Sequence, residues 1–493
     1  MKTLSGVLLF ASMGPLCFAA GTEVADAVQN RDIVTLRTLL KQHAAVNAAQ
    51  ADGTTALHWA AHWNDAEAVN LLIKAGANAK SVNRYGATPL SEAAPMGNAA
   101  IIEELLKAGA DPNTRTTADG ETVLMTSARA GNVDAVKALL SHGADVNAKE
   151  AYKGQTALMW AAAEGHPQIV KLLLEHGADW KIQSSFRETK IPKLSAASSV
   201  SPISRGGLTA FLFAAREGDL ETAKVMLDAG VDVNQTDVDG TSGLVISAMN
   251  KKYTFAKFLL DRGADPNVTD VKGRAALYAA IDARNEDWTA LPMRKELDSM
   301  PSIDLIKAIV AHGANVNAKL TKNLPGRSGM DFGDATLDEG TTPLMRAARS
   351  ADAETMRILL AAGADPKLVT KDGNNALMFA AGIGYRDKQT QGTETQALEA
   401  VKICMDRGLD LNQSNGKGET ALHGAANRGS DLLVKFLVEH GAKLDAQSKA
   451  GFTPLDIAMG KDSFFALPVP HDSTVALLRS LGGPEGSHHE GTH

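Results

Sequence analysis

A few short stretches of the chain carry residue types that can do chemistry. Gly326-Arg327-Ser328-Gly329 sets a serine among glycines, as in some hydrolases, but it stands in a loop and not at a strand-to-helix turn. Asp237-Val238-Asp239-Gly240 has the letters that open a calcium loop, yet the bidentate Glu that should follow is missing, so a tight turn explains them better. His488, His489 and His493 have no acidic or cysteine partner at a fixed spacing.

Other catalytic signatures are also missing from the sequence. There is no P-loop, no His-Glu-x-x-His and no haem-attachment motif. Asn234, Asn267 and Asn412 open formal glycosylation sequences, but all three recur at one position of a repeated turn. We therefore predict no catalytic residue, no metal ligand and no cofactor, and hence no enzyme activity.

The charge balance argues against a nucleic-acid partner. The formal net charge is −7 and the pI is about 6.0. A chain of this charge has no excess of Lys and Arg with which to contact phosphates.

The elements that position any functional side chain repeat along the chain. A phrase such as DGTTALHWAA, from Asp52, or KGETALHGAA, from Lys417, returns eleven times, and most consecutive copies lie 33 or 34 residues apart. A fixed period of this length predicts a stacked repeat array. The opening glycines are Gly53, Gly86, Gly120, Gly154, Gly207, Gly240, Gly273, Gly340, Gly373, Gly418 and Gly451.

Each repeat has two apolar stripes at helical spacing. In the unit that starts at Gly418, Leu422, Ala425 and Ala426 form the first stripe. The second consists of Val434, Leu437 and Val438. Residues at i, i+3 and i+4 share one helix face, so two short helices per unit are predicted. A glycine follows the second helix of each unit after the first, as at Gly143, where a left-handed residue ends the helix; the N-terminal unit, about residues 22 to 48, lacks it and is expected to be a cap.

The joint pattern is similar to that of the ankyrin-repeat family over about residues 22 to 482. The resemblance implies an all-α repeat solenoid, a stack of helix-turn-helix units with β-hairpin fingers and about twelve units including caps. It also implies that a partner protein binds along the concave face. The histidine of the family motif is present only at His58 and His423, and methionine replaces it at four positions, where packing is expected to substitute for hydrogen bonds: Met125, Met159, Met345 and Met378.

The chain outside the repeats has two distinct ends. Residues 1–20 combine Lys2, an apolar stretch and a small-residue sequence, which predicts a cleaved signal peptide of an exported, bacterial-type protein. A retained membrane anchor and lipid attachment at Cys17 are weaker alternatives, because the apolar stretch is short and Leu16 is large. Residues 21–482 are expected to form one ankyrin-repeat domain, with no membrane span after cleavage, and residues 483–493 a disordered tail.

Four insertions break the repeat period. Residues 183–206 and 320–339 fall at fingers and are expected to be extended surface loops, whereas 283–301 and 383–396 separate the two helices of a unit. The stretch from Trp288 to Leu297 has the composition of a short additional helix. Insertions in repeat arrays collect on loops, often near a binding face.

The resemblance implies which residues contact a partner. In ankyrin repeats these are finger residues beside the opening glycine and the two residues after the Ala-Ala pair. Matched position by position, the candidates are His62, Trp63, Tyr85, Met96, Arg129, Tyr152, Glu164, Arg216, Glu217, Arg349, Asn427 and Arg428. Aromatic residues, Met and Arg are favoured at interface centres. Trp and Tyr can instead merely cover the finger backbone. Four other aromatic residues take a position that is usually leucine, so they are expected in the core: Trp59, Trp160, Phe213 and Phe379.

These observations favour a non-enzymatic scaffold for protein–protein interaction, monomeric, exported to the periplasm or secreted, with one protein partner. Two alternatives remain open. One is a secreted effector that imitates a eukaryotic ankyrin module in a host cell. The other is a ligand-binding or enzymatic role in the inserted loops.

Overall fold

The computed structural model describes residues 21–189, 203–287, 297–324, 336–387, 389–461 and 470–487. The chain forms two compact units, which divide between Asp179 and Trp180. The predicted signal peptide and the His-containing end of the chain lie outside the described residues, as do Gly326–Gly329.

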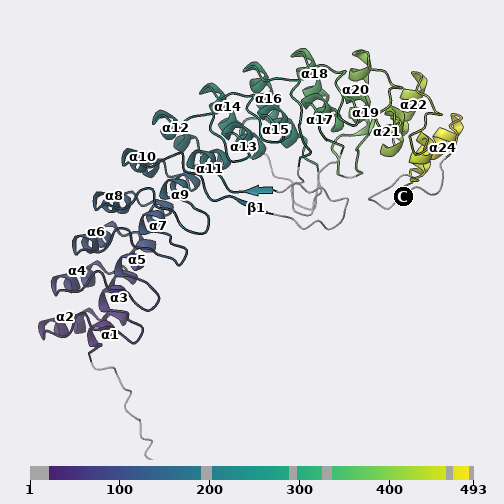
Figure 1. Ribbon diagram of the computed structural model, residues 1–493. Helices are drawn as coiled ribbons and strands as arrows, with labels where there is room; N and C mark the ends of the chain where they lie inside the picture. The colour runs from purple at the N-terminus through teal and green to yellow at the C-terminus, as the bar shows by residue number, and fades with distance from the viewer. Residues whose placement is uncertain are drawn as a thin grey trace, which may run out of the picture. The chain divides into compact units, whose positions relative to one another are not determined.

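From residue 21 on, where the structure describes it, the N-terminal unit is a stack of five helix pairs (Figure 1). First helices pack on first helices and second helices on second helices of the neighbouring pairs. In Figure 1 the second helices, the first helices and the finger loops form three adjacent columns. The pairs are α1 (Glu23–Gln29) with α2 (Ile33–Lys41), α3 (Ala56–His62) with α4 (Ala66–Lys74), α5 (Pro89–Ala93), continued by the 3₁₀ helix η1 (Ala94–Met96), with α6 (Ala99–Lys107), α7 (Val123–Arg129) with α8 (Val133–Ser141), and α9 (Ala157–Ala163) with α10 (Pro167–Glu175).

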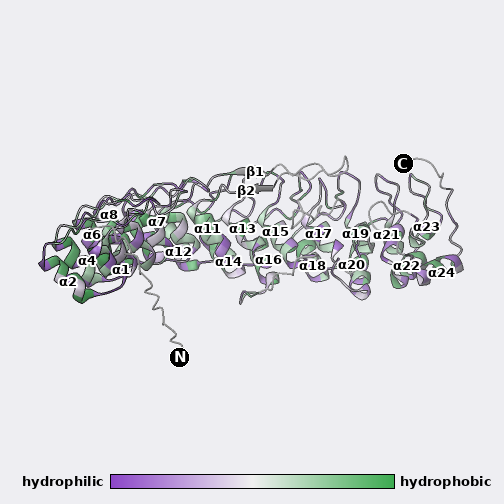
Figure 2. Ribbon diagram, turned by 90° about the horizontal axis from the view of Figure 1, so that it is seen from below, coloured by the Kyte–Doolittle hydropathy of each residue, from purple (hydrophilic) through white to green (hydrophobic). Residues whose placement is uncertain are grey.

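The C-terminal unit contains seven further pairs within its described residues and a short ladder of two antiparallel strands, β1 (Arg187–Thr189) and β2 (Ile203–Arg205). Figure 2 shows these strands on the edge of the unit opposite its second helices. The pairs are α11 (Ala210–Glu217) with α12 (Leu220–Asp228), α13 (Gly243–Met249) with α14 (Tyr253–Asp261), α15 (Ala276–Arg284) with α16 (Ser302–Ala311), α17 (Pro343–Arg349) with α18 (Ala353–Ala361), α19 (Ala376–Ala381) with α20 (Glu394–Asp406), α21 (Ala421–Arg428) with α22 (Asp431–Glu439), and α23 (Pro454–Ala458) with α24 (Asp472–Ser480). The twelve pairs of the two units confirm the predicted all-α ankyrin fold.

Side-chain caps explain where these short helices begin. Thr122 and Thr156 accept a hydrogen bond from the backbone N–H three residues on, at the start of α7 and α9. Asp65 and Asn132 do the same for α4 and α8. Each such cap contributes about 1 kcal/mol. Because helices of seven to nine residues are marginal alone, burial between neighbouring pairs must supply the rest of their stability.

Turns of successive units are tied to one another by repeated hydrogen bonds. In the fingers, the N–H of Arg84 donates to the carbonyl of Asp52 at 2.7 Å. In the turns that follow the second helices, the Asn267 side chain accepts from the N–H of Asn315 at 2.7 Å and donates to the carbonyl of Gly313 at 3.1 Å. Asn412 makes the equivalent pair of bonds, so its position in a glycosylation-like sequence follows from this structural role.

The two motif histidines fasten the fingers, and the methionines do not. His58 Nδ1 lies 2.8 Å from the hydroxyl of Thr55, and its Nε2 lies 3.0 Å from the carbonyl of Ala87 in the next finger. Met125 is buried at the equivalent place, and its sulfur accepts the N–H of Thr122 in its own unit. In the Met-containing units packing therefore replaces one polar link, as the sequence predicts.

Three expectations about loops and tail need correction. The insertion 183–206 is not an extended loop throughout, because β1 and β2 pair near its two ends. The last residues of 383–396 begin α20. Residues 483–487 of the predicted disordered tail are held in place: the carbonyl of Pro484 accepts from Thr453 Oγ1 at 2.8 Å, and the N–H of Gly486 donates to Asp456 at 2.7 Å.

In the described part of the chain, none of the helices is both long enough and apolar enough to cross a bilayer. The predicted helix between Trp288 and Leu297 lies outside the described residues, except for Leu297 itself.

Candidate functional site

Large side chains are exposed on one surface of the N-terminal unit. We call it the first-helix surface. It is formed by the fingers and the C-terminal ends of α3, α5–η1, α7 and α9. Tyr85 is 77% exposed, Met96 54% and Tyr152 53%. They belong to a finger, to the end of η1 and to another finger. The structure therefore brings these three predicted residues to one accessible surface.

The end of α3 carries a second group of predicted residues. His62 is exposed, and its Nδ1 lies 2.9 Å from Glu92 of α5. Trp63 is half-buried: its ring stacks on Trp59 at 6.1 Å between centroids, and the Arg31 guanidinium covers it at 4.1 Å. Trp63 therefore contributes to packing within the chain, whereas the side chain of His62 stays exposed to solvent.

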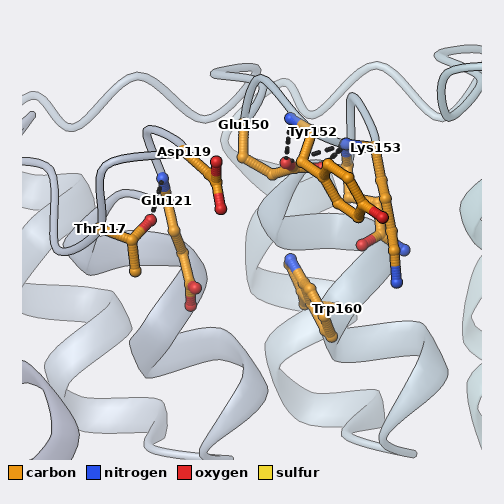
Figure 3. Close-up of a pocket in the computed structure, with 8 residues that line it drawn as sticks. Thr117, Asp119, Glu121, Glu150, Tyr152, Lys153 and Trp160 are labelled. Carbon is orange, nitrogen blue, oxygen red and sulfur yellow. Dashed lines mark hydrogen bonds between the residues drawn. The ribbon is translucent and has the colours of Figure 1, made fainter.

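A recess of about 170 Å³ opens between two fingers of the first-helix surface. Figure 3 shows it between the finger of Asp119 and Glu121 and the finger of Tyr152, with Trp160 of α9 beneath. At its edge Arg129 pairs with Glu121 at 3.0 Å and lies over the Trp160 ring at 5.0 Å. The sequence analysis identified Arg129 and Tyr152 but missed the carboxylates of Asp119, Glu121 and Glu150. Asp119 and Glu121 face the finger of Glu150 only when successive fingers stack.

Glu150 has a structural role at this recess. Its carboxylate accepts hydrogen bonds from the N–H groups of Tyr152, Lys153 and Gln155 at 2.7, 2.8 and 2.9 Å. These bonds shape the finger that carries Tyr152. Glu164, another predicted contact residue, is exposed at the end of α9.

In the C-terminal unit, Arg216 and Glu217 pair with each other. Arg216 Nε donates to Glu217 at 2.8 Å, and its guanidinium lies 4.9 Å from the centre of the Phe213 ring. Both side chains are still partly exposed.

Arg349 does not belong to an accessible surface, contrary to the expectation from sequence. Its side chain is 0% exposed, and its guanidinium Nη1 lies 2.8 Å from a carboxylate oxygen of Asp287. Asp287 belongs to the insertion 283–301, which therefore covers the position.

The predicted contact residue Arg428 is likewise buried, by the insertion 383–396. It donates to the carbonyl of Gly392 at 2.6 Å and lies 4.2 Å from the centre of the Tyr385 ring. Burial lowers the pKa of its guanidinium. Asn427 remains exposed, but its amide donates to the carbonyls of Gly382 and Tyr385 at 3.1 and 3.3 Å. Both residues hold an inserted segment of the same chain.

The four aromatic residues expected in the core behave differently from one another. Phe213 and Phe379 are buried. Trp59 and Trp160 are only half-buried: the Trp59 indole bonds to Gln50 of its finger, and Trp160 lines a recess between two fingers. The calcium-like letters at Asp237 form a turn: its carboxylate accepts from the N–H groups of Asp239 and Thr241 at 2.9 and 2.8 Å.

The fold defines a class of protein, a scaffold of stacked helical repeats. A family model described as ankyrin repeats (3 copies) matches residues 24–116, 97–184, 203–294, 299–387 and 393–467. The chain belongs to the ankyrin-repeat family. Ankyrin repeats form scaffolds for protein–protein interaction, and the family is typically non-enzymatic.

Similar proteins match short stretches of the chain. It is 34% identical over 85 residues to ankyrin repeat domain-containing protein OPG015 of Monkeypox virus, which covers 17% of this chain and 20% of that protein. It is 31% identical over 118 residues to ankyrin repeat and SOCS box protein 16 of Mus musculus, covering 24% and 25%. The chain thus spans a quarter or less of the length of these relatives. The solved human ASB11 ankyrin repeat domain is 23% identical, with a TM-score of 0.39, and the match covers 49% of this chain and 98% of that one.

Proposed function

We propose that this protein is a non-enzymatic scaffold, exported to the periplasm or beyond the cell, that holds one partner protein on the first-helix surface of its N-terminal unit. One observation carries the choice of surface: Tyr85, Met96 and Tyr152 are each more than half exposed there. Aromatic rings and Met are enriched at the centres of protein interfaces, where a few such residues supply most of the binding energy.

The C-terminal unit supports this choice by contrast. At its matching positions Arg349 and Arg428 are buried under inserted segments, and Asn427 is bonded to one of them. These positions therefore have less surface to offer, while the exposed positions on the N-terminal unit remain open.

Replacing Tyr85, Met96 and Tyr152 together by alanine is expected to abolish partner capture without loss of helical structure. More than half of each of the three residues is exposed, so far-ultraviolet circular dichroism should be unchanged. The measurement is cross-linking and affinity purification from native extract, with mass spectrometry of the proteins recovered by the wild type.

The control for this experiment is a variant with Val34 and Leu432 replaced by alanine. Both are exposed apolar residues on second helices, at 71% and 39%. The partner should be retained by this variant and lost by the triple variant. If the triple variant retains the partner at the wild-type level, the first-helix surface is not where the partner binds.

The proposal that the protein is exported rests on the pattern of residues 1–20. Cell fractionation is expected to find the processed chain in the periplasm, shortened by about twenty residues by mass spectrometry. Its appearance in a host cell's cytosol would favour the effector alternative. An unprocessed chain in the cytoplasm would contradict export altogether.

A further inference from the structure

A buried hydrogen-bond donor without an acceptor lies at the recess between the two fingers. The indole nitrogen of Trp160 is buried and has no hydrogen-bond partner among the residues that the structure describes. Trp160 also lines the recess. Figure 3 shows this nitrogen at the end of the ring nearest the finger of Glu150 and Tyr152. A buried polar group normally finds a partner, so the unpaired donor calls for an explanation.

The same chain shows what satisfies a tryptophan at this position. Trp59 is the fourth residue of α3, as Trp160 is of α9. The Trp59 indole donates to the side-chain oxygen of Gln50 at 2.8 Å. The amide nitrogen of Gln50 in turn donates to Asp26 and Gln29 of the preceding unit, each at 2.7 Å. A carboxamide therefore bridges the indole and acceptors of the neighbouring unit.

The corresponding finger residue beside Trp160 cannot play this role. Gln50 and Glu150 occupy matching places, since the N–H of each bonds across its own finger, to Thr54 and Gln155 respectively. Glu150 is a carboxylate whose oxygens accept three backbone N–H groups of the finger. The internal acceptor found beside Trp59 is thus replaced by a recess of about 170 Å³.

The opposite wall of the recess offers acceptors. Glu121 accepts from Thr126 Oγ1 and from Arg129, each at 3.0 Å, and a carboxylate has capacity for further donors. Asp119 is exposed beside it. The wall therefore resembles the Asp26 side of the Gln50 site in its chemistry.

These groups discriminate among the side chains that a partner could insert. A carboxylate could accept from the indole N–H and pair with Lys153, which also lines the recess, but it has no hydrogen to donate to Asp119 or Glu121. A Lys or Arg cation could pair with them, but it has no acceptor atom for the indole N–H of Trp160. A carboxamide has both an acceptor for the indole N–H, its oxygen, and two donor hydrogens for the carboxylates, on its NH₂ group. The volume of the recess is several times the roughly 30 Å³ that a water molecule occupies, so a carboxamide group has room there.

We propose that the recess is a subsite for the side chain of a glutamine or asparagine of the partner protein. The carboxamide oxygen accepts from Trp160 Nε1, the NH₂ group donates to Glu121 or Asp119, and the methylene stem lies against the Tyr152 ring. This inference rests on the proposed function and specifies the chemistry of the partner at one point of the first-helix surface.

The test titrates the full chain with N-acetyl-L-glutamine N-methylamide, whose side chain is its one primary carboxamide. The observable is the set of tryptophan indole signals in ¹H–¹⁵N spectra, with Trp160 assigned by its loss in Trp160→Phe. We expect the Trp160 signal to shift saturably at millimolar probe, and the Trp59 signal to stay in place because Gln50 already satisfies it. The glutamate and lysine analogues should shift it far less.

Trp160→Phe keeps an aromatic ring at the site, so it separates a lost donor from a lost fold. In the same spectra it should abolish the saturable response of the backbone amide signals of Tyr152 and Lys153, which line the recess, while its circular dichroism matches the wild type. No shift with the glutamine probe, or an equal or larger shift with the lysine analogue, would overturn the proposal. Because the probe is a small molecule, these outcomes are independent of whether the triple alanine variant captures a partner.

Discussion

Asp287→Ala is expected to lower the free energy of unfolding of the C-terminal unit by about 3–5 kcal/mol. The Arg349 side chain is 0% exposed and its guanidinium lies 2.8 Å from Asp287. Removing the carboxylate leaves a cation that water cannot reach. The measurement is chemical denaturation followed by circular dichroism.

Two further variants make this prediction specific. Glu217→Ala removes the exposed pair with Arg216 and should cost only about 0–1 kcal/mol. Arg349→Met combined with Asp287→Leu removes both charges, so most of the stability should return. If Asp287→Ala alone costs no more than Glu217→Ala, Asp287 does not stabilise the buried guanidinium.

Cys404 is expected to react with a thiol reagent about a thousandfold more slowly in the native protein than in the unfolded chain. Burial raises the pKa of its thiol from 9.0 to about 12, so the thiolate fraction near pH 8 falls by about that factor. A Cys17→Ser background leaves one cysteine, since the chain has 2. The measurement is the rate of modification with and without denaturant.

The pH dependence of stability has a definite sign for this group. Because the pKa of Cys404 is raised in the folded state, the neutral thiol stabilises the fold below about pH 9, and this contribution is lost as the pH rises toward 12. Cys404→Ala should therefore show a weaker loss of stability above pH 9 than the wild type. Native Cys404 that reacts as fast as the unfolded chain would contradict its burial.

The insertions give the two units different surfaces. In the N-terminal unit the positions at the ends of the first helices are open, as at Met96 and Glu164. In the C-terminal unit, the segments that carry Asp287 and Gly392 lie over Arg349 and Arg428. The inserted residues are therefore part of the packing of this unit.

Much of the fold was predictable because its signals are local. Thr caps, apolar residues at helical spacing and a glycine after each second helix recur within a single unit, and each acts on neighbouring residues. The period that joins them predicted the helix pairs. Among the candidate contact residues, Tyr85, Met96 and Tyr152 were also found by their type and position, and they are exposed.

Tertiary structure alone decided which of the remaining positions are accessible. Arg349 and Asp287 are 62 residues apart, and Arg428 and Gly392 are 36 apart, so no periodic pattern indicates that they meet. The recess at Trp160 likewise forms between two fingers, since Asp119 and Glu121 face Tyr152 only after the units stack. The amino-acid sequence determined the helix pairs through contacts between near neighbours. Which surface stays open was decided by long-range packing, because a side chain's burial depends on whichever distant segment covers it.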